Sequence, residues 1–113
     1  MMESKLLWIL DVKGNPVHEP DVVVWGQWFE FSGEERTMAF TTFCDAAGKD
    51  VVVSTVFTGM DQGMGIGAPV LYETMVWRGE DIEEGYRYRT KEEAVAGHAS
   101  AVKAIEESDD RTA

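Results

Sequence analysis

Two apolar runs on either side of a glycine-rich loop constrain the fold of this chain more than any other feature. Residues 51–58, VVVSTVFT, and residues 69–77, PVLYETMVW, are mainly β-branched, aromatic and other apolar side chains, which favour strands. A third run of this kind, TMAFTTFC at residues 37–44, precedes them across the turn DAAGKD. Successive strands with short connections are typical of antiparallel hairpins. The three runs therefore predict an antiparallel β-meander.

A C-terminal helix is predicted behind the meander. Thr90 and Glu93, in the sequence TKEE, form a capping box, which marks the start of a helix. The residues after it recur at helical spacing and are mostly small, so this helix can lie close to a sheet: Ala94, Val95, His98, Ala99, Val102 and Ile105. We expect residues 106–113, EESDDRTA, to be a frayed acidic tail.

The segment VVVWGQWFEF, residues 22–31, allows two interpretations. Its valines favour a strand, whereas Val22, Trp25 and Phe29 follow each other at helical spacing behind a proline and an aspartate that could begin a helix. We expect a short helix, with a strand as the alternative.

Two weaker strands complete the prediction. Residues 6–12, LLWILDV, predict a strand that ends in the turn KGNP, and residues 86–89 predict a short strand after an acidic connection at 78–85. The order of elements predicts one α+β domain over residues 1–113, in which the meander, the C-terminal helix and the short N-terminal helix form a two-layer sandwich.

The charge of the chain limits its partners. The 113 residues include 21 acidic and 10 basic side chains, for a net charge of −11, and such a surface repels nucleic acid and anionic lipid. Solubility explains this charge more simply than mimicry of nucleic acid. The apolar run at residues 6–10 is too short for a secretory signal or a membrane span, and the single Cys44 cannot form an internal disulfide. We therefore expect a cytosolic protein that binds neither nucleic acid nor membrane.

The glycine loop does not match the known phosphate-binding motifs. GMGIGAP follows a strand, but the next residues predict another strand and not the helix that a dinucleotide site needs, and no Gly-Lys-Ser/Thr follows. The simplest interpretation is a flexible hairpin connection with glycines at positive φ. Anion binding by its backbone amides remains an alternative.

No catalytic set or metal site is recognisable in the chain. His18 and His98 lack metal-ligand neighbours at typical spacing, and Cys44 is expected to be a buried thiol and not a nucleophile beside His98. We therefore predict no cofactor, no metal and no catalytic residue.

Glu73 is the most informative polar residue of the predicted sheet. By strand alternation it shares a face with Leu71, Met75 and Trp77, where a carboxylate must be exposed, paired or functional; Arg78, Arg87 and Arg89 are its possible partners. The candidate ligand- or partner-binding residues are Asp61, Gln62, Gly63, Gly65, Gly67, Glu73, Trp77, Arg87 and His98.

Parts of the sequence resemble a family of small proteins encoded by actinobacterial phages. The resemblance covers roughly residues 20–105 and rests on the pattern VSTVF-x-G-x-D, then ETMV-x-x-G, then E-x-x-x-G-H. Relatives often have His where this chain has Gln62, which indicates a tolerant position. The resemblance supports a helix over residues 22–31 and implies an accessory phage protein in the bacterial cytoplasm, without a particular biochemical activity.

Two functional hypotheses follow. The first is a protein-interaction module, expected to form a homodimer, that acts on a host component, because four tryptophans and six methionines are difficult to hide under one helix-covered face. The alternative is a small-molecule or nucleotide binder, or an enzyme, with a pocket formed by the glycine loop, Glu73 and His98.

Overall fold

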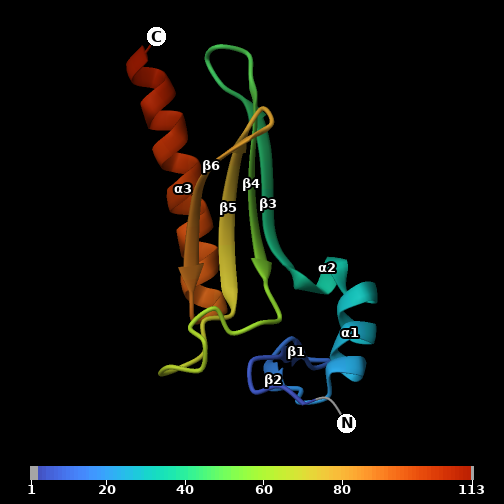
Figure 1. Cartoon of the computed structure of the whole chain (residues 1–113). Coiled ribbons are helices and arrows are strands. Elements are labelled where there is room, and N and C mark those ends of the chain that lie inside the picture. The colour runs from blue at the N-terminus through green and yellow to red at the C-terminus, as the bar shows by residue number, and fades with distance from the viewer. Residues whose placement is uncertain (1–2, 113) are drawn as a thin grey trace.

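A long four-stranded sheet with one helix along it dominates the structure, and a smaller N-terminal unit lies beyond one end of this sheet (Figure 1). This computed structural model describes residues 3–112, and the side chains of residues 3–107. The molecule is elongated, with extents of 57 × 27 × 25 Å.

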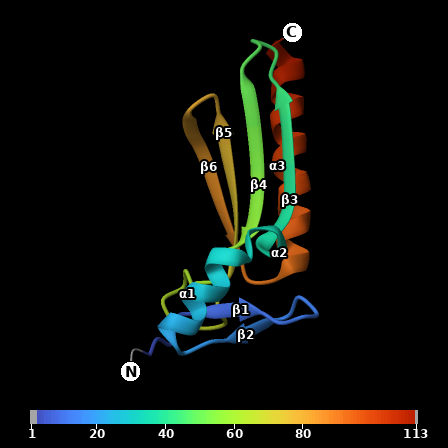
Figure 2. The same ribbon diagram turned by 90° about the vertical axis from the view of Figure 1, so that its right-hand side faces the viewer.

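The sheet is the predicted antiparallel meander. Its strands are β3 (Thr37–Cys44), β4 (Asp50–Phe57), β5 (Tyr72–Arg78) and β6 (Asp81–Tyr88), and they lie side by side in chain order. The helix α3 (Lys91–Thr112) runs along one face of the sheet (Figure 2). The predicted α+β sandwich is thereby confirmed.

The start of α3 is fixed by the predicted capping box. The amide of Thr90 donates to a carboxylate oxygen of Glu93 at 3.0 Å, and the amide of Glu93 donates to the Thr90 hydroxyl at 3.1 Å. Two amides that the helix itself cannot satisfy are therefore bonded. The helix continues to Thr112; the expected fraying of residues 106–113 stays a prediction, since the side chains after Glu107 lie outside the described part.

The face that α3 turns to the sheet differs partly from the predicted one. Ala94, His98 and Ala101 are buried, and Val102 and Ile105 pack beside them. In contrast, Val95 and Ala99 are exposed. They lie one position beyond the buried residues 94 and 98, and one position turns the helix by about 100°.

The N-terminal unit consists of a small hairpin and two short helices. Strands β1 (Trp8–Leu10) and β2 (Pro16–His18) form a separate two-stranded sheet, and α1 (Val22–Phe31) and α2 (Gly33–Arg36) follow. The strand predicted at residues 6–12 is therefore shorter, and β2 was not predicted. A three-residue strand with exposed side chains has no pattern from which it could be recognised.

The ambiguous valine-rich segment is a helix. The Asp21 side chain accepts hydrogen bonds from the amides of Val23 and Val24, and this cap outweighs the strand preference of the valines. The Trp25 indole donates to the carbonyls of Trp8 and Gly59, at 3.1 and 2.9 Å. These bonds tie α1 to β1 and to the start of the glycine loop.

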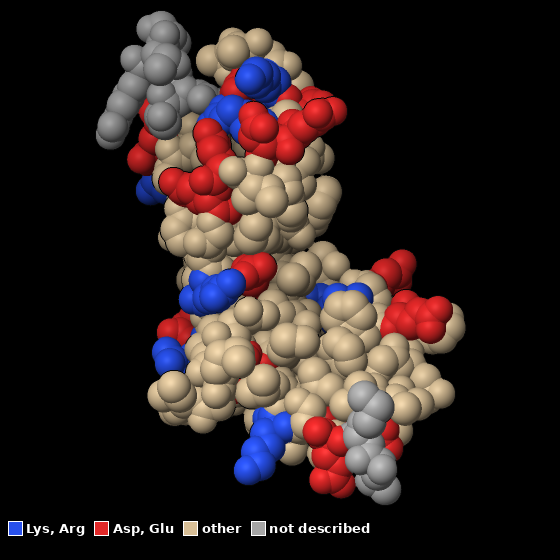
Figure 3. Space-filling view, in the orientation of Figure 1, with Lys and Arg blue, Asp and Glu red and all other residues tan. Residues whose placement is uncertain are grey.

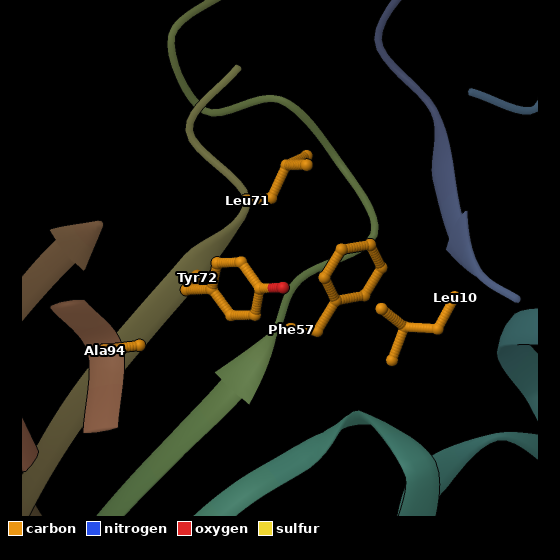
Figure 4. Packing of buried hydrophobic residues seen from close by; sticks show 5 residues of the cluster. All are labelled: Leu10, Phe57, Leu71, Tyr72 and Ala94. Atoms are coloured by element: carbon orange, nitrogen blue, oxygen red, sulfur yellow. The ribbon is translucent and has the colours of Figure 1, made fainter. Parts of the chain in front are cut away.

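The core joins the two units at the end of the sheet. Buried side chains from four segments form one cluster there (Figure 4). The Phe57 ring lies edge-on to Tyr72 at 5.4 Å between centroids and edge-on to Trp28 of α1 at 5.9 Å. A second cluster lies farther along α3. The first cluster is Leu10, Phe57, Leu71, Tyr72 and Ala94, and the second is Val51, Val53, Val76 and Ala101.

Strand β6 corrects the prediction for residues 78–89. The expected acidic connection is mostly strand, and only Gly79 and Glu80 lie between the paired residues Arg78 and Asp81. Nearly every side chain of β6 is exposed, so the strand has no apolar alternation to reveal it. Charged side chains are common on edge strands, where they discourage pairing with other chains.

Candidate functional site

The base of the glycine loop is organised around a buried carboxylate. Asp61 is 4% exposed, and its carboxylate accepts hydrogen bonds from the amides of Gly63, Gly65 and Val70 at 2.8, 3.0 and 2.9 Å. The bond from Val70 is the largest of the effects that lower the pKa of Asp61, against the opposing effect of burial. Asp61 is therefore a structural anion that closes the loop on itself.

The same hydrogen bonds argue against the binding of an external anion by the amides of the loop. The amides that could cradle a phosphate already donate to Asp61, and the amide of Gln62 donates to the Val70 carbonyl at 2.8 Å. A second anion would meet the Asp61 charge. At the loop tip, Met64 and Ile66 are 70% and 78% exposed, and Gly67 is exposed beside them. The loop is a turn with an internal anion and not an empty anion cradle.

His98 belongs to a polar layer between α3 and the sheet. One ring nitrogen lies 2.8 Å from the Thr41 hydroxyl and the other lies 2.8 Å from the Thr55 hydroxyl, which in turn lies 2.5 Å from the Thr74 hydroxyl. Thr55 and Thr74 are fully buried and His98 is 6% exposed. Burial lowers the pKa of His98. The layer separates the two apolar clusters, and its polar atoms satisfy one another.

Glu73, Arg87 and Trp77 lie on the opposite side of the sheet. The buried residues of β5 are Tyr72, Thr74 and Val76, so strand alternation turns Glu73 and Trp77 away from α3. Arg87, directly across on β6, donates to Glu73 at 3.1 Å. The other two possible partners are engaged elsewhere, Arg78 with Asp45 and Glu83 and Arg89 with the Ala68 carbonyl.

The nine candidate residues thus occupy three separate places: the glycine loop, the layer beneath α3 and the far face of the sheet. Glu73 and His98 are on opposite faces, so they do not line one pocket with the loop. Cys44 is exposed and not buried as expected. Its hydrogen bond to Asp50 raises the pKa of the thiol, and Cys44 lies on the face away from His98.

The far face of the sheet carries an apolar surface, which we call the open face. Among the described residues, no other helix or strand lies along it (Figure 2). The register places its residues in adjacent rows: Phe40 is level with Met75, with Ser54 between them, and Val52, Trp77 and Ile82 are level with one another. Phe40 and Ile82 are 60% and 62% exposed. The open face consists of Phe40, Val52, Val56, Met75, Trp77 and Ile82.

Sequence reasoning found only part of this surface. Alternation in VVVSTVFT separates Val52 and Val56 from Val51, Val53 and Phe57, and Met75 and Trp77 had been placed with Glu73. Phe40 and Ile82 were missed. Ile82 fell in the segment read as a connection. Alternation in TMAFTTFC alone would have placed Phe40 with Met38 and Thr42, but Met38 packs against the first core cluster because the register of β3 shifts between Thr37 and Ala39.

The described residues offer neither a metal site nor a membrane-spanning helix. Within residues 3–107, whose side chains the structure describes, no cluster of three His, Cys, Asp or Glu side chains could hold a metal ion. No helix of residues 3–112 is both long and apolar enough to cross a membrane.

Comparisons of the chain with protein-family models, curated proteins and solved structures give no match.

Proposed function

We propose that this protein is a protein-interaction module that forms a homodimer through its open face. The observation that carries the proposal is the one-sided covering of the sheet: α3 covers one face, and the other presents adjacent aromatic and aliphatic side chains. Figure 3, which views the molecule from the side of the open face, displays a largely uncharged region at the middle of the sheet. Exposed and half-exposed apolar side chains gathered on one face in this way mark interaction sites.

The size of the open face supports a stable dimer. Four strands of seven or eight residues, at ~4.8 Å between strands and ~3.3 Å per residue, present roughly 500 Å² in projection. The accessible area of side chains exceeds their projection, so the whole far face of the sheet, the open face together with its polar neighbours such as Glu73 and Arg87, approaches the ~800 Å² per partner of a typical stable interface. Two sheets can pack face to face with interdigitating side chains.

The setting of this activity comes from the sequence resemblance alone. We propose that the dimer acts as a phage accessory protein in the cytoplasm of the bacterial host and binds a host component. The separation of Glu73, His98 and the glycine loop supports a binding role over a catalytic pocket built from these residues.

The experiment that tests dimerisation is light scattering on the purified chain and two matched variants. We expect twice 12.6 kDa at micromolar concentration for the parent chain. Trp77→Glu should shift the mass toward the monomer, since a carboxylate would enter an apolar interface. Ile66→Glu makes the same kind of change at the exposed loop tip and should leave the dimer intact.

Two results would contradict the proposal. A monomeric parent chain at high concentration would show that the open face does not bind a second copy. Equal dissociation by Trp77→Glu and Ile66→Glu would show that added charge, and not the open face, controls the assembly.

A further inference from the structure

A second surface lies in the N-terminal unit, away from the open face. A cleft of about 700 Å³ separates the turn after β1 from α1 and α2. Typical binding pockets enclose about 300–1,000 Å³. Its apolar lining is Leu10, Val12, Trp28 and Phe31, and its charged lining is Asp11, Lys13 and Glu35.

The apolar part of the cleft has a buried floor and exposed walls. Leu10 is 7% exposed, and the Trp28 ring is held edge-on against Phe57 of the core. In contrast, Phe31 and Val12 are almost fully exposed, at 80% and 104%. A fixed floor with apolar side chains in water on both walls could enclose an apolar side chain of a partner.

The charged groups determine which partner fits. Asp11 and Glu35 line the cleft against one base, Lys13. One oxygen of Asp11 accepts hydrogen bonds from the amides of Lys13 and Asn15 in the turn, so the other oxygen is the one that could meet a partner. Arg36, the one base of α2, lies 3.8 Å over the Phe29 ring and donates to the Phe29 carbonyl and to Ser32. Its charge also acts on the neighbouring Glu35, so it offsets part of the acidic charge at the cleft. Residues 3–36 contain seven acids and three bases, and acidic side chains gather over α1 and α2 at the right-hand edge of Figure 3.

We infer that this cleft binds a basic peptide segment of a partner protein, with an aromatic side chain inserted between Val12 and Phe31. The basic residues beside that anchor would face Asp11 and Glu35. The acidic surroundings would steer such a segment to the cleft and repel acidic ones. This inference does not rest on the proposed dimer, since no residue of the open face lines the cleft.

Indole N–H signals in a ¹H–¹⁵N spectrum can test the inference directly. The chain has four tryptophans, and Trp28→Phe and Trp77→Phe would assign the signals of the cleft and of the open face. We expect the peptide acetyl-Arg-Phe-Arg-amide to shift the Trp28 signal at millimolar concentration and to leave Trp77 unchanged. Acetyl-Glu-Phe-Glu-amide, without the charge match, and acetyl-Arg-Gly-Arg-amide, without the anchor, should each bind at least several-fold more weakly.

Variants of the cleft provide the matched controls. Phe31→Ser and Glu35→Lys should both weaken the binding of acetyl-Arg-Phe-Arg-amide. Phe40→Ser removes another exposed phenylalanine, on the open face, and should not. Equal binding of the basic and acidic peptides, equal binding with and without phenylalanine, no shift of Trp28, or the same loss in Phe40→Ser would each overturn the inference. None of these readouts depends on the mass measured by light scattering.

Discussion

His98 shows how its surroundings determine the chemistry of a single residue. Both ring nitrogens are bonded to threonine hydroxyls, those of Thr41 and Thr55, and the ring is buried. The neutral ring can donate from one nitrogen and accept at the other. Protonation would add a charge in a place that water does not reach. The residue therefore acts as a neutral spacer that fixes α3 on the sheet.

The burial of His98 predicts a pH-dependent stability. Because the pKa of His98 is lowered in the folded chain, the unfolded chain binds more protons between the two pKa values. The contribution of His98 is therefore complete above its unfolded pKa of about 6.5 and is lost as the pH falls toward the folded value. We expect urea unfolding to show lower stability at pH 5 than at pH 8, and His98→Gln to reduce this difference.

The same variant also tests the polar layer directly. His98→Gln itself should lower the stability by about 1–3 kcal/mol at pH 8, since part of the polar layer loses its partners. An unchanged pH difference in His98→Gln would contradict the assigned role.

Among the elements, the glycine loop is stabilised by hydrogen bonds to Asp61 at its base and not by contacts of its tip. Asp61→Asn should lower the stability by about 1–3 kcal/mol, because the amide group that replaces one oxygen cannot accept the bond from Gly65. Met64→Ser and Ile66→Ser in the same loop should each change it by less than about 0.5 kcal/mol, since both side chains are exposed. Thermal or urea unfolding measures all three; a large loss in the tip variants would show that the tip is packed.

The close contact between α3 and β6 depends on glycine at position 97, which has no side chain. A Cβ added at Gly97 would overlap the Tyr88 ring. Glycine to alanine inside a helix normally stabilises by about 1 kcal/mol, but here overpacking should reverse the sign and cost about 1–3 kcal/mol. In a Tyr88→Ala background the same substitution should become neutral or stabilising. Destabilisation of equal size in both backgrounds would contradict this explanation.

The elements also show where sequence reasoning succeeds. The meander, the capping box at Thr90 and the helix at 22–31 follow from local patterns, namely β-branched runs, Thr-x-x-Glu spacing and an Asp cap. Strands β2 and β6 do not, because their side chains are mostly exposed and only pairing with a neighbour defines them. The role of Asp61 has a local signal, an aspartate two residues before a glycine, which is typical of side-chain-capped turns.

For the molecule as a whole, the sequence could divide the residues of β4 and β5 between two faces but could not place the N-terminal unit. The cleft requires the turn after β1 to approach the end of α1, and that approach depends on the bonds from Trp25 to Trp8 and Gly59. These residues are far apart in sequence. No periodicity or motif reports such a contact, so neither the cleft nor the exposed Phe31 was predicted.

The net charge predicts how the proposed dimer responds to salt. Each copy carries −11, so two copies repel, and the apolar open faces must overcome that repulsion. The screening length falls from about 30 Å at 0.01 M salt to about 8 Å at 0.15 M. We therefore expect the dimer dissociation constant to decrease at least several-fold between these salt concentrations, as measured by sedimentation equilibrium.

The proposed peptide binding provides an internal comparison of opposite sign. Attraction between the acidic cleft and a basic peptide should weaken over the same salt range, since screening reduces attraction and repulsion alike.

The variant Arg87→Gln tests whether ion pairs or apolar contacts hold the proposed dimer together. Arg87 and Glu73 are the ion pair beside the open face, and the variant removes its positive charge. If the dimer weakens with salt, and Arg87→Gln abolishes that dependence, ion pairs and not the apolar residues hold the two copies together.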